Sequence, residues 1–542
     1  MKNGENYNRS RRNFLKGIGV SLLLFPLLQS CKQQAKVLLM RLTGTNHILG
    51  HRLWAKNFPK ASEQIHIPYL IVGGGISGLS AARQFHKKGI SNFLLVELEG
   101  HLGGNSSSGE NAYSKYPLGA HYLPLPNFED KALLQFLEEE KIILGYDANG
   151  LAVYDEQQLT FTPQERLFYK NSWHEGLVPK FGNSEKDNSD FDRFFALMEH
   201  FRTAKGSDGK YLFDIPLSFS SSDAANRALD KLAMKNWLHQ QQFSSKALFD
   251  YVDYCSRDDF GIGIEFVSAW AGIHYFAARK HDSSADKKEN VLTWPEGNAR
   301  LATHLKKYTK DKTLKNHLVF DLKIVGSKVV SLVFDSTKNK TIEIIADQVV
   351  VATPQFVNQY FLEDRRKISR DFQYAPWLLA TLTLSNLPDD YGFPLCWDNV
   401  IHGTKGLGYI YDQHQSLQQL QAKKVITYYC SFSASDLKKS RRKLYQTKKE
   451  DWKKWVFNDL KIAHPNLEIN TESIEIHLLG HGMISPVAGF LFGESRKKAT
   501  VPIAQKIYFA HSDLSGISIF EEAFHQGINA VNQILDEAAL DS

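Results

Sequence analysis

A predicted strand, a glycine-rich turn and a helix follow one another near the start of the chain. Residues 68–72 are mostly apolar and predict a short buried strand, which Gly73-x-Gly75-x-x-Gly78 follows directly. In this spacing the first glycine allows a tight turn, and the second lets the backbone approach a pyrophosphate. The third lets the helix pack closely against the strand. The segment therefore predicts a dinucleotide-binding site.

The residues around the turn supply the rest of such a site. Ile76 and Ser77 open the predicted helix, whose free N–H groups and dipole would face a phosphate. Glu97 ends a second predicted strand, 19 residues after Gly78, where an acid accepts hydrogen bonds from ribose hydroxyl groups. A glycine-rich turn without a ligand is the weaker interpretation, because all these elements are in register. We therefore expect an α/β fold with a Rossmann-type domain.

The composition excludes several other classes of protein. Hydrophobic residues make up 43% and charged residues 23% of the 542 residues, as in ordinary globular proteins. The chain as a whole is thus neither disordered nor a coiled coil. Beyond Met40 no apolar run is long enough to cross a bilayer. Four cysteines exclude a disulfide-stapled scaffold.

The beginning of the chain resembles an export signal that ends at Cys31. The sequence Ser-Arg-Arg-Asn-Phe-Leu-Lys at residues 10–16 precedes an apolar run over residues 17–28, an arrangement typical of a twin-arginine signal. The run ends in Leu-Gln-Ser followed by Cys31, which resembles a lipobox. An ordinary signal peptide with a chance cysteine is the alternative. We expect export to the periplasmic side and a membrane partner, reached through a lipidated Cys31.

The net charge of +6 does not indicate a nucleic-acid partner. Residues 1–30 contain five Lys or Arg residues and one Glu, so four of the six surplus positive charges lie in the predicted signal. The rest of the chain is close to neutral, and we expect no nucleic acid to bind. A Lys- and Arg-rich stretch at residues 438–454 alternates with Asp, Glu and Gln, which indicates a solvated helix face.

Three later segments resemble the flavin-containing amine oxidase superfamily. Residues 346–354 (Ala-Asp-Gln-Val-Val-Val-Ala-Thr-Pro) are similar to its strand that returns to the nucleotide domain. Residues 294–298 (Trp-Pro-Glu-Gly-Asn) are similar to its Pro-x-Gly-Gly turn. Residues 508–513 and 520–527 resemble its closing strand, acid and helix. The resemblance implies FAD as the cofactor. Within the superfamily, residues 374–377, 397–400 and 511–516 resemble a subgroup of exported bacterial FAD-dependent oxidoreductases.

The resemblance also assigns residues to the cofactor. Gly103 and Gly104 stand at the superfamily's Gly-Gly pair, with Asn105 where an arginine is frequent. Gly119 and Ala120 belong to the loop that passes the flavin. Asp513 corresponds to the acid that binds the ribityl–phosphate chain. Ile519 and Phe520 begin the helix whose N–H groups face the negative charge of reduced flavin.

The expected architecture is a discontinuous Rossmann-type FAD-binding domain with an inserted α+β substrate domain. A signal peptide with a lipobox covers residues 1–31 and a tether residues 32–65. The FAD-binding parts cover residues 66–125, 290–360 and 481–542. The substrate domain covers residues 126–289 and 361–480.

Six residues are candidates for chemistry at the flavin: His121, His274, Tyr275, Trp397, Asp398 and His481. Core packing is the alternative for the histidine of the flavin-passing loop and for the aromatic stretch at residues 270–276. Asp398 would pair with a cationic substrate or cap a turn. His477 and His481 have an HxxxH spacing without an evident third ligand, so we expect no metal site.

Lysine and cysteine receive no catalytic role. We place no lysine over the flavin. The cysteines at positions 255, 396 and 430 are predicted to be buried thiols, with one disulfide as the alternative.

The predicted function is FAD-dependent oxidation of an amine or related small molecule by hydride transfer to flavin. The chain has one complete GxGxxG, whereas enzymes that reduce flavin with NAD(P)H commonly carry a second dinucleotide fold. We therefore expect oxygen, a quinone or a carrier protein as electron acceptor. One alternative is a desaturase or isomerase of an unsaturated lipid or polyprenoid. Another is a non-catalytic module that keeps the fold.

Overall fold

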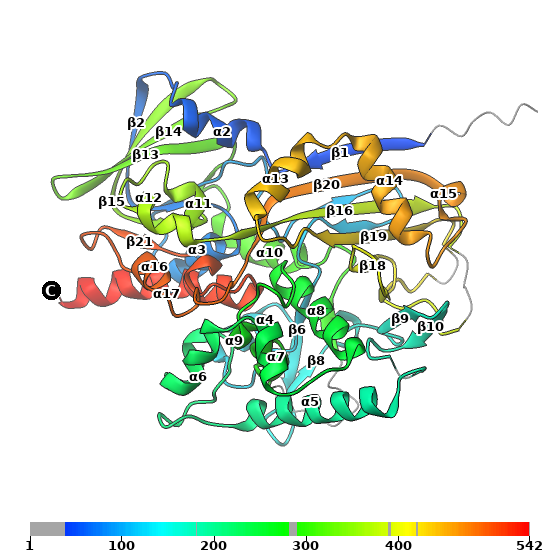
Figure 1. Ribbon diagram of the computed structural model, residues 1–542. Coiled ribbons are helices and arrows are strands. Elements are labelled where there is room, and N and C mark those ends of the chain that lie inside the picture. Colours follow the sequence, from blue (N-terminus) through cyan, green and yellow to red (C-terminus); the bar gives the residue numbers. More distant parts are fainter. Residues whose placement is uncertain (1–37, 180, 281–289, 388–391, 419–420, 541–542) are drawn as a thin grey trace, which may run out of the picture. The chain divides into compact units, whose positions relative to one another are not determined.

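A computed structural model describes residues 38–179, 181–280, 290–387, 392–418 and 421–540 (Figure 1). Residues 40–542 form one compact unit. Residues 1–39 form another, of which only the last two are described. The predicted export signal and Cys31 thus lie outside the described residues.

The first sheet has seven strands in the order β12-β3-β2-β15-β14-β13, and β21 also pairs with β15. Pairs β12–β3, β3–β2, β2–β15 and β15–β21 are parallel, whereas β13, β14 and β15 form an antiparallel meander. The strand bounds are β2 Ala61–Val72, β3 Phe93–Val96, β12 Thr313–Leu314, β13 His317–Val325, β14 Lys328–Asp335, β15 Lys340–Val351 and β21 Ile507–Phe509. The expected Rossmann-type α/β domain is confirmed.

Helices α3 (Ile76–Lys87), α10 (Ala299–Lys306) and α17 (Phe520–Leu540) pack beside this sheet (Figure 1). The contact between α3 and α17 is very close, because a Cβ added at Gly527 would lie 2.2 Å from the carbonyl oxygen of Ser77. The last helix is thereby fixed against the helix of the glycine-rich turn.

The second sheet has eight strands in the order β1-β20-β16-β19-β18-β17-β9-β10. Pairs β20–β16, β16–β19, β19–β18, β18–β17 and β9–β10 are antiparallel, whereas β17–β9 is parallel. The bounds are β1 Leu39–Gly44, β9 Glu165–Tyr169, β10 Ser172–Glu175, β16 Tyr374–Leu384, β17 Asp398–Ile401, β18 Gly408–Tyr411, β19 Lys424–Ser431 and β20 Thr471–Ile484. All eleven residues of β16 are buried, so this strand is central to the sheet.

Helices and short hairpins complete the fold. The remaining α-helices are α2 His47–Ala55, α4 Lys131–Glu139, α5 Glu185–Thr203, α6 Ala224–Ala228, α7 Met234–Gln240, α8 Lys246–Phe260, α9 Ala269–Ala277, α11 Gln355–Asn358, α12 Arg365–Ile368, α13 Leu437–Gln446, α14 Lys449–Leu460, α15 Leu467–Asn470 and α16 Glu494–Ala499. Two hairpins pair β4 Ser108–Glu110 with β5 Lys115–Pro117 and β7 Ile143–Tyr146 with β8 Ala152–Tyr154. A further two-stranded sheet pairs β6 Tyr122–Pro124 with the distant β11 Val291–Thr293.

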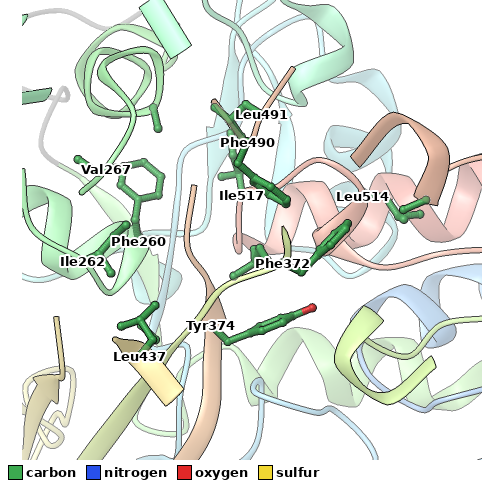
Figure 2. Packing of buried hydrophobic residues seen from close by; sticks show 14 of the residues in the cluster. Phe260, Ile262, Val267, Phe372, Tyr374, Leu437, Phe490, Leu491, Leu514 and Ile517 are labelled. Atoms are coloured by element: carbon green, nitrogen blue, oxygen red, sulfur yellow. The ribbon is translucent and has the colours of Figure 1, made fainter. Parts of the chain in front are cut away.

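One cluster of buried apolar side chains joins the two sheets. It includes Val72 and Val349 of the first sheet and Ala375 and Leu379 of the second. Figure 2 shows part of it, where Phe260, Phe490 and Ile517 come from segments far apart in the sequence. Because this core is continuous, the predicted division into two domains does not appear as two separate compact units. The predicted domain boundaries stay predictions.

The expected tether over residues 32–65 is wrong from Leu39 onward. This part forms β1, α2 and the first residues of β2. Strand β1 is mostly exposed and gains its order by pairing with β20, which lies near the other end of the chain. A pairing between such distant segments leaves no local hydrophobic pattern. Across the described ranges, no helix combines the length and apolar character needed to cross a membrane.

Candidate active site

The three glycines of the turn have different surroundings. Gly73 has a φ of +105°, and a Cβ there would lie 2.8 Å from the carbonyl oxygen of Ala352. At Gly78 an added Cβ would lie 1.9 Å from the carbonyl oxygen of Gly73. These two glycines are required by the protein itself. Around an added Cβ at Gly75, in contrast, no heavy atom lies within 4 Å.

Gly75 is the N-cap of α3, and no side chain caps this helix. The N–H groups of the first turn, at Ile76 and Ser77, therefore receive no hydrogen bond from a capping side chain. Open space beside a glycine and an uncapped helix N-terminus together fit a phosphate that approaches the backbone.

Glu97 follows β3 at the same edge of the sheet. Its carboxylate accepts hydrogen bonds from the backbone N–H groups of Gly74 (2.5 Å) and Glu99 (2.8 Å). Burial is the main cause that raises the pKa of Glu97 to about 7, against the lowering effect of these bonds. The side chain remains partly exposed, so its other lone pairs face outward. This placement fits an acid that binds a ribose.

The Gly-Gly pair packs directly on the turn. Gly103 donates its N–H to the carbonyl of Gly74 (2.8 Å) and has a φ of +122°, while Gly104 has a φ of +57°. The next residue, Asn105, donates from its side chain to the carbonyl of Gly482 (2.5 Å). Asn105 thus connects the first segment of the site to β20.

A cavity lies between the nucleotide segments and the second sheet. Its lining includes five residues predicted to contact flavin: Asn105, Gly119, Ala120, Ile519 and Phe520. The opposite lining comes from strands β16, β19 and β20, through Trp377, Leu379, Tyr429, Leu479 and Met483. The structure therefore brings the predicted flavin segments together around one cavity.

Three buried polar atoms of this lining have no hydrogen-bond partner among the described residues. They are Asn298 Oδ1, Trp377 Nε1 and the hydroxyl oxygen of Tyr429. Leaving such groups without a partner costs about 1–3 kcal/mol each. All three residues line the cavity, so a polar ring system that reached these atoms would supply the missing partners.

Four aromatic rings meet at one end of the cavity. The ring centroid of His121 lies 4.6 Å from that of Tyr429, 4.9 Å from Tyr122 and 5.8 Å from Trp397. Burial lowers the pKa of His121 to about 4, so the imidazole is neutral near pH 7. His121 lines the cavity and Trp397 lies against its ring, and a role of either residue in catalysis stays a prediction.

Carboxyl groups lie on the helical side of the cavity. Asp258 and Asp259, at the end of α8, and Glu521, in the first turn of α17, all line it. Burial raises the pKa of Asp258 to about 7 and that of Asp259 to about 6. Arg279 forms an ion pair with Glu521. The cavity therefore holds more potential negative charge than positive charge.

Asp398 lies close to this group but does not line the cavity. Its carboxylate accepts a hydrogen bond from the hydroxyl of Tyr254 (3.5 Å). Burial, and then the charge of Asp258, raise its pKa well above the usual range. Asp398 therefore stays protonated and uncharged over a wider pH range than an exposed aspartate.

Three predicted catalytic residues lie elsewhere. His274 is buried in the core, where its Nε2 lies 3.1 Å from the carbonyl oxygen of Asp214 and its ring stacks on Trp270. Burial lowers its pKa to about 3. Tyr275 does not line the cavity and contacts Phe276. The lining residue nearest to them in the sequence is Arg279, which follows the end of α9.

His481 is also turned away from the cavity. Its ring stacks on Phe356 with 3.7 Å between centroids. The register of β20 on β16 shifts here, since Ala375 pairs with Met483 but Trp377 pairs with Leu479. This bulge breaks the alternation of side chains, so that Gly482 and Met483 line the cavity instead.

Asp513 is bound within the protein. Its carboxylate accepts hydrogen bonds from the N–H of Gln355 (2.8 Å) and from the hydroxyl of Tyr374. It therefore fixes the segment after β15 to β16. Both side-chain amide atoms of Gln355 are buried without a partner among the described residues. A contact of Asp513 with flavin stays a prediction.

The described residues contain no group of three His, Cys, Asp or Glu side chains that could hold a metal ion. Cys255, Cys396 and Cys430 are buried free thiols, as predicted, and the alternative of a disulfide is wrong. Burial raises the pKa of each thiol, to about 12 for Cys396 and Cys430. These thiols are therefore unreactive in the folded protein.

Sequence reasoning missed Asp258, Asp259, Arg279 and Tyr429 as lining residues. Asp258 and Asp259 are adjacent acids at the end of an otherwise amphipathic helix, and Arg279 follows an aromatic stretch. Paired acids beside a helix C-terminus, where the dipole disfavours them, were the available signal. Nothing local to Tyr429 distinguishes it from its neighbours in a buried strand.

Comparison with known proteins agrees with this geometry. Residues 71–139 match the family model described as an NAD(P)-binding Rossmann-like domain. No curated protein matches the sequence. A structure of wild-type putrescine oxidase bound to putrescine covers 87% of this chain and 100% of its own, with 14% identity and a TM-score of 0.62.

Two other solved structures are similar over comparable lengths. Cyclohexylamine oxidase from Brevibacterium oxydans covers 87% of this chain and 99% of its own, with 13% identity and a TM-score of 0.61. A CLA-producing fatty acid isomerase from P. acnes covers 86% of this chain and 98% of its own, with 13% identity and a TM-score of 0.59. This chain therefore has the fold of the amine oxidases, with a Rossmann-like nucleotide-binding domain at its core.

Proposed function

We propose that this protein is an FAD-dependent oxidoreductase that oxidises an amine. We further propose that it is exported and anchored through Cys31, and that oxygen, a quinone or a carrier protein accepts its electrons. The fold and the matched nucleotide domain support an FAD enzyme. The chemistry of the cavity supports the substrate class.

The residues that would hold FAD lie in three segments of the chain. The N-terminus of α3 and Gly75 would bind the pyrophosphate, and Glu97 the adenosine ribose. Gly119, Ala120 and the start of α17 would face the ring. FAD, when bound, supplies the two-electron acceptor for a hydride, which no side chain provides.

The observation that carries the amine proposal is the pairing of aromatic rings with acids. An ammonium ion in the cavity would meet Tyr122 and Tyr429, whose aromatic rings attract cations. It then meets Asp258 and Asp259, which would lose their protons more easily beside a positive charge. Such a site concentrates amines. It also releases the substrate's proton to a carboxylate, and amine oxidation requires the neutral amine.

A small recess on the other side of His121 extends this chemistry. It is lined by Trp294, Trp397, Tyr411 and Asp412, among others. Asp412 is 4% exposed, and its Oδ1 has no partner among the described residues. The other carboxylate oxygen accepts a hydrogen bond from Thr427 (2.8 Å). A second carboxyl beside aromatic walls again favours a basic substrate.

The apolar strand residues of the cavity favour a second candidate, an isomerase of an unsaturated fatty acid. Trp377, Leu379 and Leu479 would accommodate an acyl chain. A fatty acid, however, brings a carboxylate close to Asp258 and Asp259, and the only lining arginine among the described residues pairs with Glu521. Like charges at short range in a buried site are costly. The amine is therefore the better fit.

An anaerobic titration tests the proposal. Purified protein is mixed with primary, secondary and cyclic amines and, separately, with linoleate, while the flavin absorbance is recorded. The expected result is bleaching by at least one amine and none by the fatty acid. An oxidised spectrum with every amine, or an altered fatty acid product with a flavin that ends oxidised, would contradict the amine assignment.

A further inference from the structure

Large apolar side chains are exposed together near the N-terminal end of the described chain. Leu42 of β1 is 44% exposed, and Ile48 and Trp54 of α2 are 76% and 60% exposed. Single exposed apolar residues are common on any protein. Three so close in sequence, on a short helix and an edge strand, are not explained by packing within this protein, and such patches mark interaction sites.

Helix α13 carries a dense group of positive charges. Residues 437–446 contain five Lys or Arg residues and no acid. Lys438, Lys439, Arg442 and Lys443 are exposed. None of these four forms an ion pair with any residue that the structure describes. The stretch therefore differs from α14, where Lys453 and Lys454 pair with Glu468 and Asp451.

The apolar and basic groups lie next to one another. The ring of His47, at the start of α2, lies 4.7 Å from the ring of Tyr445 in α13. Strand β1 pairs with β20, on which α13 packs. Figure 1 shows β1, α2 and α13 along the same upper side of the molecule. The sequence pattern assigns the basic stretch to a solvated helix face, but the structure places it beside exposed apolar side chains.

We propose that β1, α2 and α13 form a docking face for an anionic membrane surface. The docking face comprises Leu42, Ile48 and Trp54, which would enter the interfacial layer, and Lys438, Lys439, Arg442 and Lys443, which attract acidic headgroups. Apolar side chains rimmed by Lys and Arg are the arrangement that holds a protein on the plane of a bilayer. Trp is the residue type most suited to that depth.

The proposed lipid anchor at Cys31 would place a membrane near this face. Cys31 lies nine residues before Met40. Nine residues span at most about 30 Å even when fully extended. A lipid on Cys31 would therefore keep the docking face close to the bilayer, and the face would in turn fix the orientation of the anchored protein. The docking face does not require the lipid, because its charge and apolar area act independently.

Site-directed fluorescence tests the proposal on the full chain. Ile48→Cys is labelled with an environment-sensitive nitrobenzoxadiazole fluorophore, in a chain that also carries Cys31→Ser. The other three thiols are buried and should not react. Matched control labels are placed at Ile469→Cys and Leu417→Cys, which are 75% and 74% exposed in the parent chain. Vesicles contain either phosphatidylglycerol mixed with phosphatidylcholine or phosphatidylcholine alone.

On anionic vesicles, label 48 should shift to the blue and become at least about threefold less accessible to iodide, while both control labels remain quenched. Changing Lys438, Lys439, Arg442 and Lys443 together to Gln should abolish the protection of label 48. We expect this loss because each Lys or Arg near an anionic bilayer raises the affinity of the protein for the vesicle several-fold. The same change at the exposed Lys310, Lys315, Lys367 and Lys498 should leave the protection intact.

Equal quenching of labels 48, 417 and 469 on anionic vesicles would overturn the proposal. Protection that is equal on phosphatidylcholine vesicles, or that survives the α13 change, would overturn the role of the charges. Circular dichroism and the melting temperature of each variant check that it folds. Protection by an added protein without vesicles would also count against the membrane as the partner.

Discussion

Replacing Gly75 and Gly78 by alanine separates cofactor binding from folding. Gly75 has φ −73° and ψ −175°, a conformation that alanine adopts readily, and an added Cβ meets no atom of the protein within 4 Å. With flavin removed, Gly75→Ala should leave the free energy of unfolding unchanged, or raise it by about 0.4–1 kcal/mol through the loss of chain freedom in the unfolded state. The fold is thus indifferent to this methyl group.

The binding of FAD, in contrast, should be sensitive to the methyl group at residue 75. If the pyrophosphate approaches the backbone at residue 75, the methyl group displaces it from one or more N–H donors. A hydrogen bond to a charged group contributes about 1.5–3 kcal/mol. The loss of one such bond raises the Kd for FAD by about 10- to 150-fold. The flavin content after purification should fall accordingly, and fluorescence titration of the flavin-free protein measures the change.

Gly78→Ala is the matched control. Its Cβ would lie 1.9 Å from the carbonyl oxygen of Gly73, so α3 must shift away from the turn. Such overpacking costs about 1–3 kcal/mol, and denaturant titration should show this loss with or without flavin. If Gly75→Ala binds FAD as tightly as the parent protein, the pyrophosphate does not approach the backbone at residue 75. If Gly78→Ala is as stable as the parent, α3 does not pack against the turn as closely as the structure shows.

Two further predictions concern the cavity and the core. Asp258→Asn should raise the free energy of unfolding by a few kcal/mol at pH 8. Burial raises the pKa of this group from 3.8 to about 7, so the folded parent loses stability as the pH rises from 4 through 7. Thermal melts of both proteins should show that Asp258→Asn is more stable than the parent, by a margin that shrinks toward pH 4. A margin that grows as the pH falls would contradict the raised pKa of Asp258. His274→Ala should cost about 2–4 kcal/mol of stability with little change in flavin reduction, whereas His121→Ala should slow reduction by amine at nearly unchanged stability. Stopped-flow reduction and denaturant titration distinguish the two, and the reverse pattern would contradict the placement of both residues.

The nucleotide segments were predictable because their signal is local. The glycines, Glu97 and the Gly-Gly pair follow one another within a short stretch, and the structure arranges them as expected. Strand β15 runs unbroken from Lys340 to Val351, so it begins before the returning strand that the sequence indicates at residues 346–354. The break at Thr447 between α13 and α14 was likewise hidden in one charged stretch.

The substrate side was less predictable because it depends on contacts between distant segments. The bulge between β16 and β20 turns the side chain of His481 away from the cavity. The sequence of neither strand predicts this bulge. The acids of α8 face the start of α17 only after the helices have packed. His274 has the residue type of a catalytic group, yet its surroundings make it part of the core. Residue type alone therefore did not distinguish site from core.

The absorbance spectrum of the natively purified protein, followed by anaerobic addition of an amine, tests the central claim most directly. The account predicts an oxidised flavin spectrum that bleaches when an amine enters the cavity, with the rate reduced in Asp258→Asn. A folded protein that carries no flavin, and takes up none when FAD is added, would contradict it.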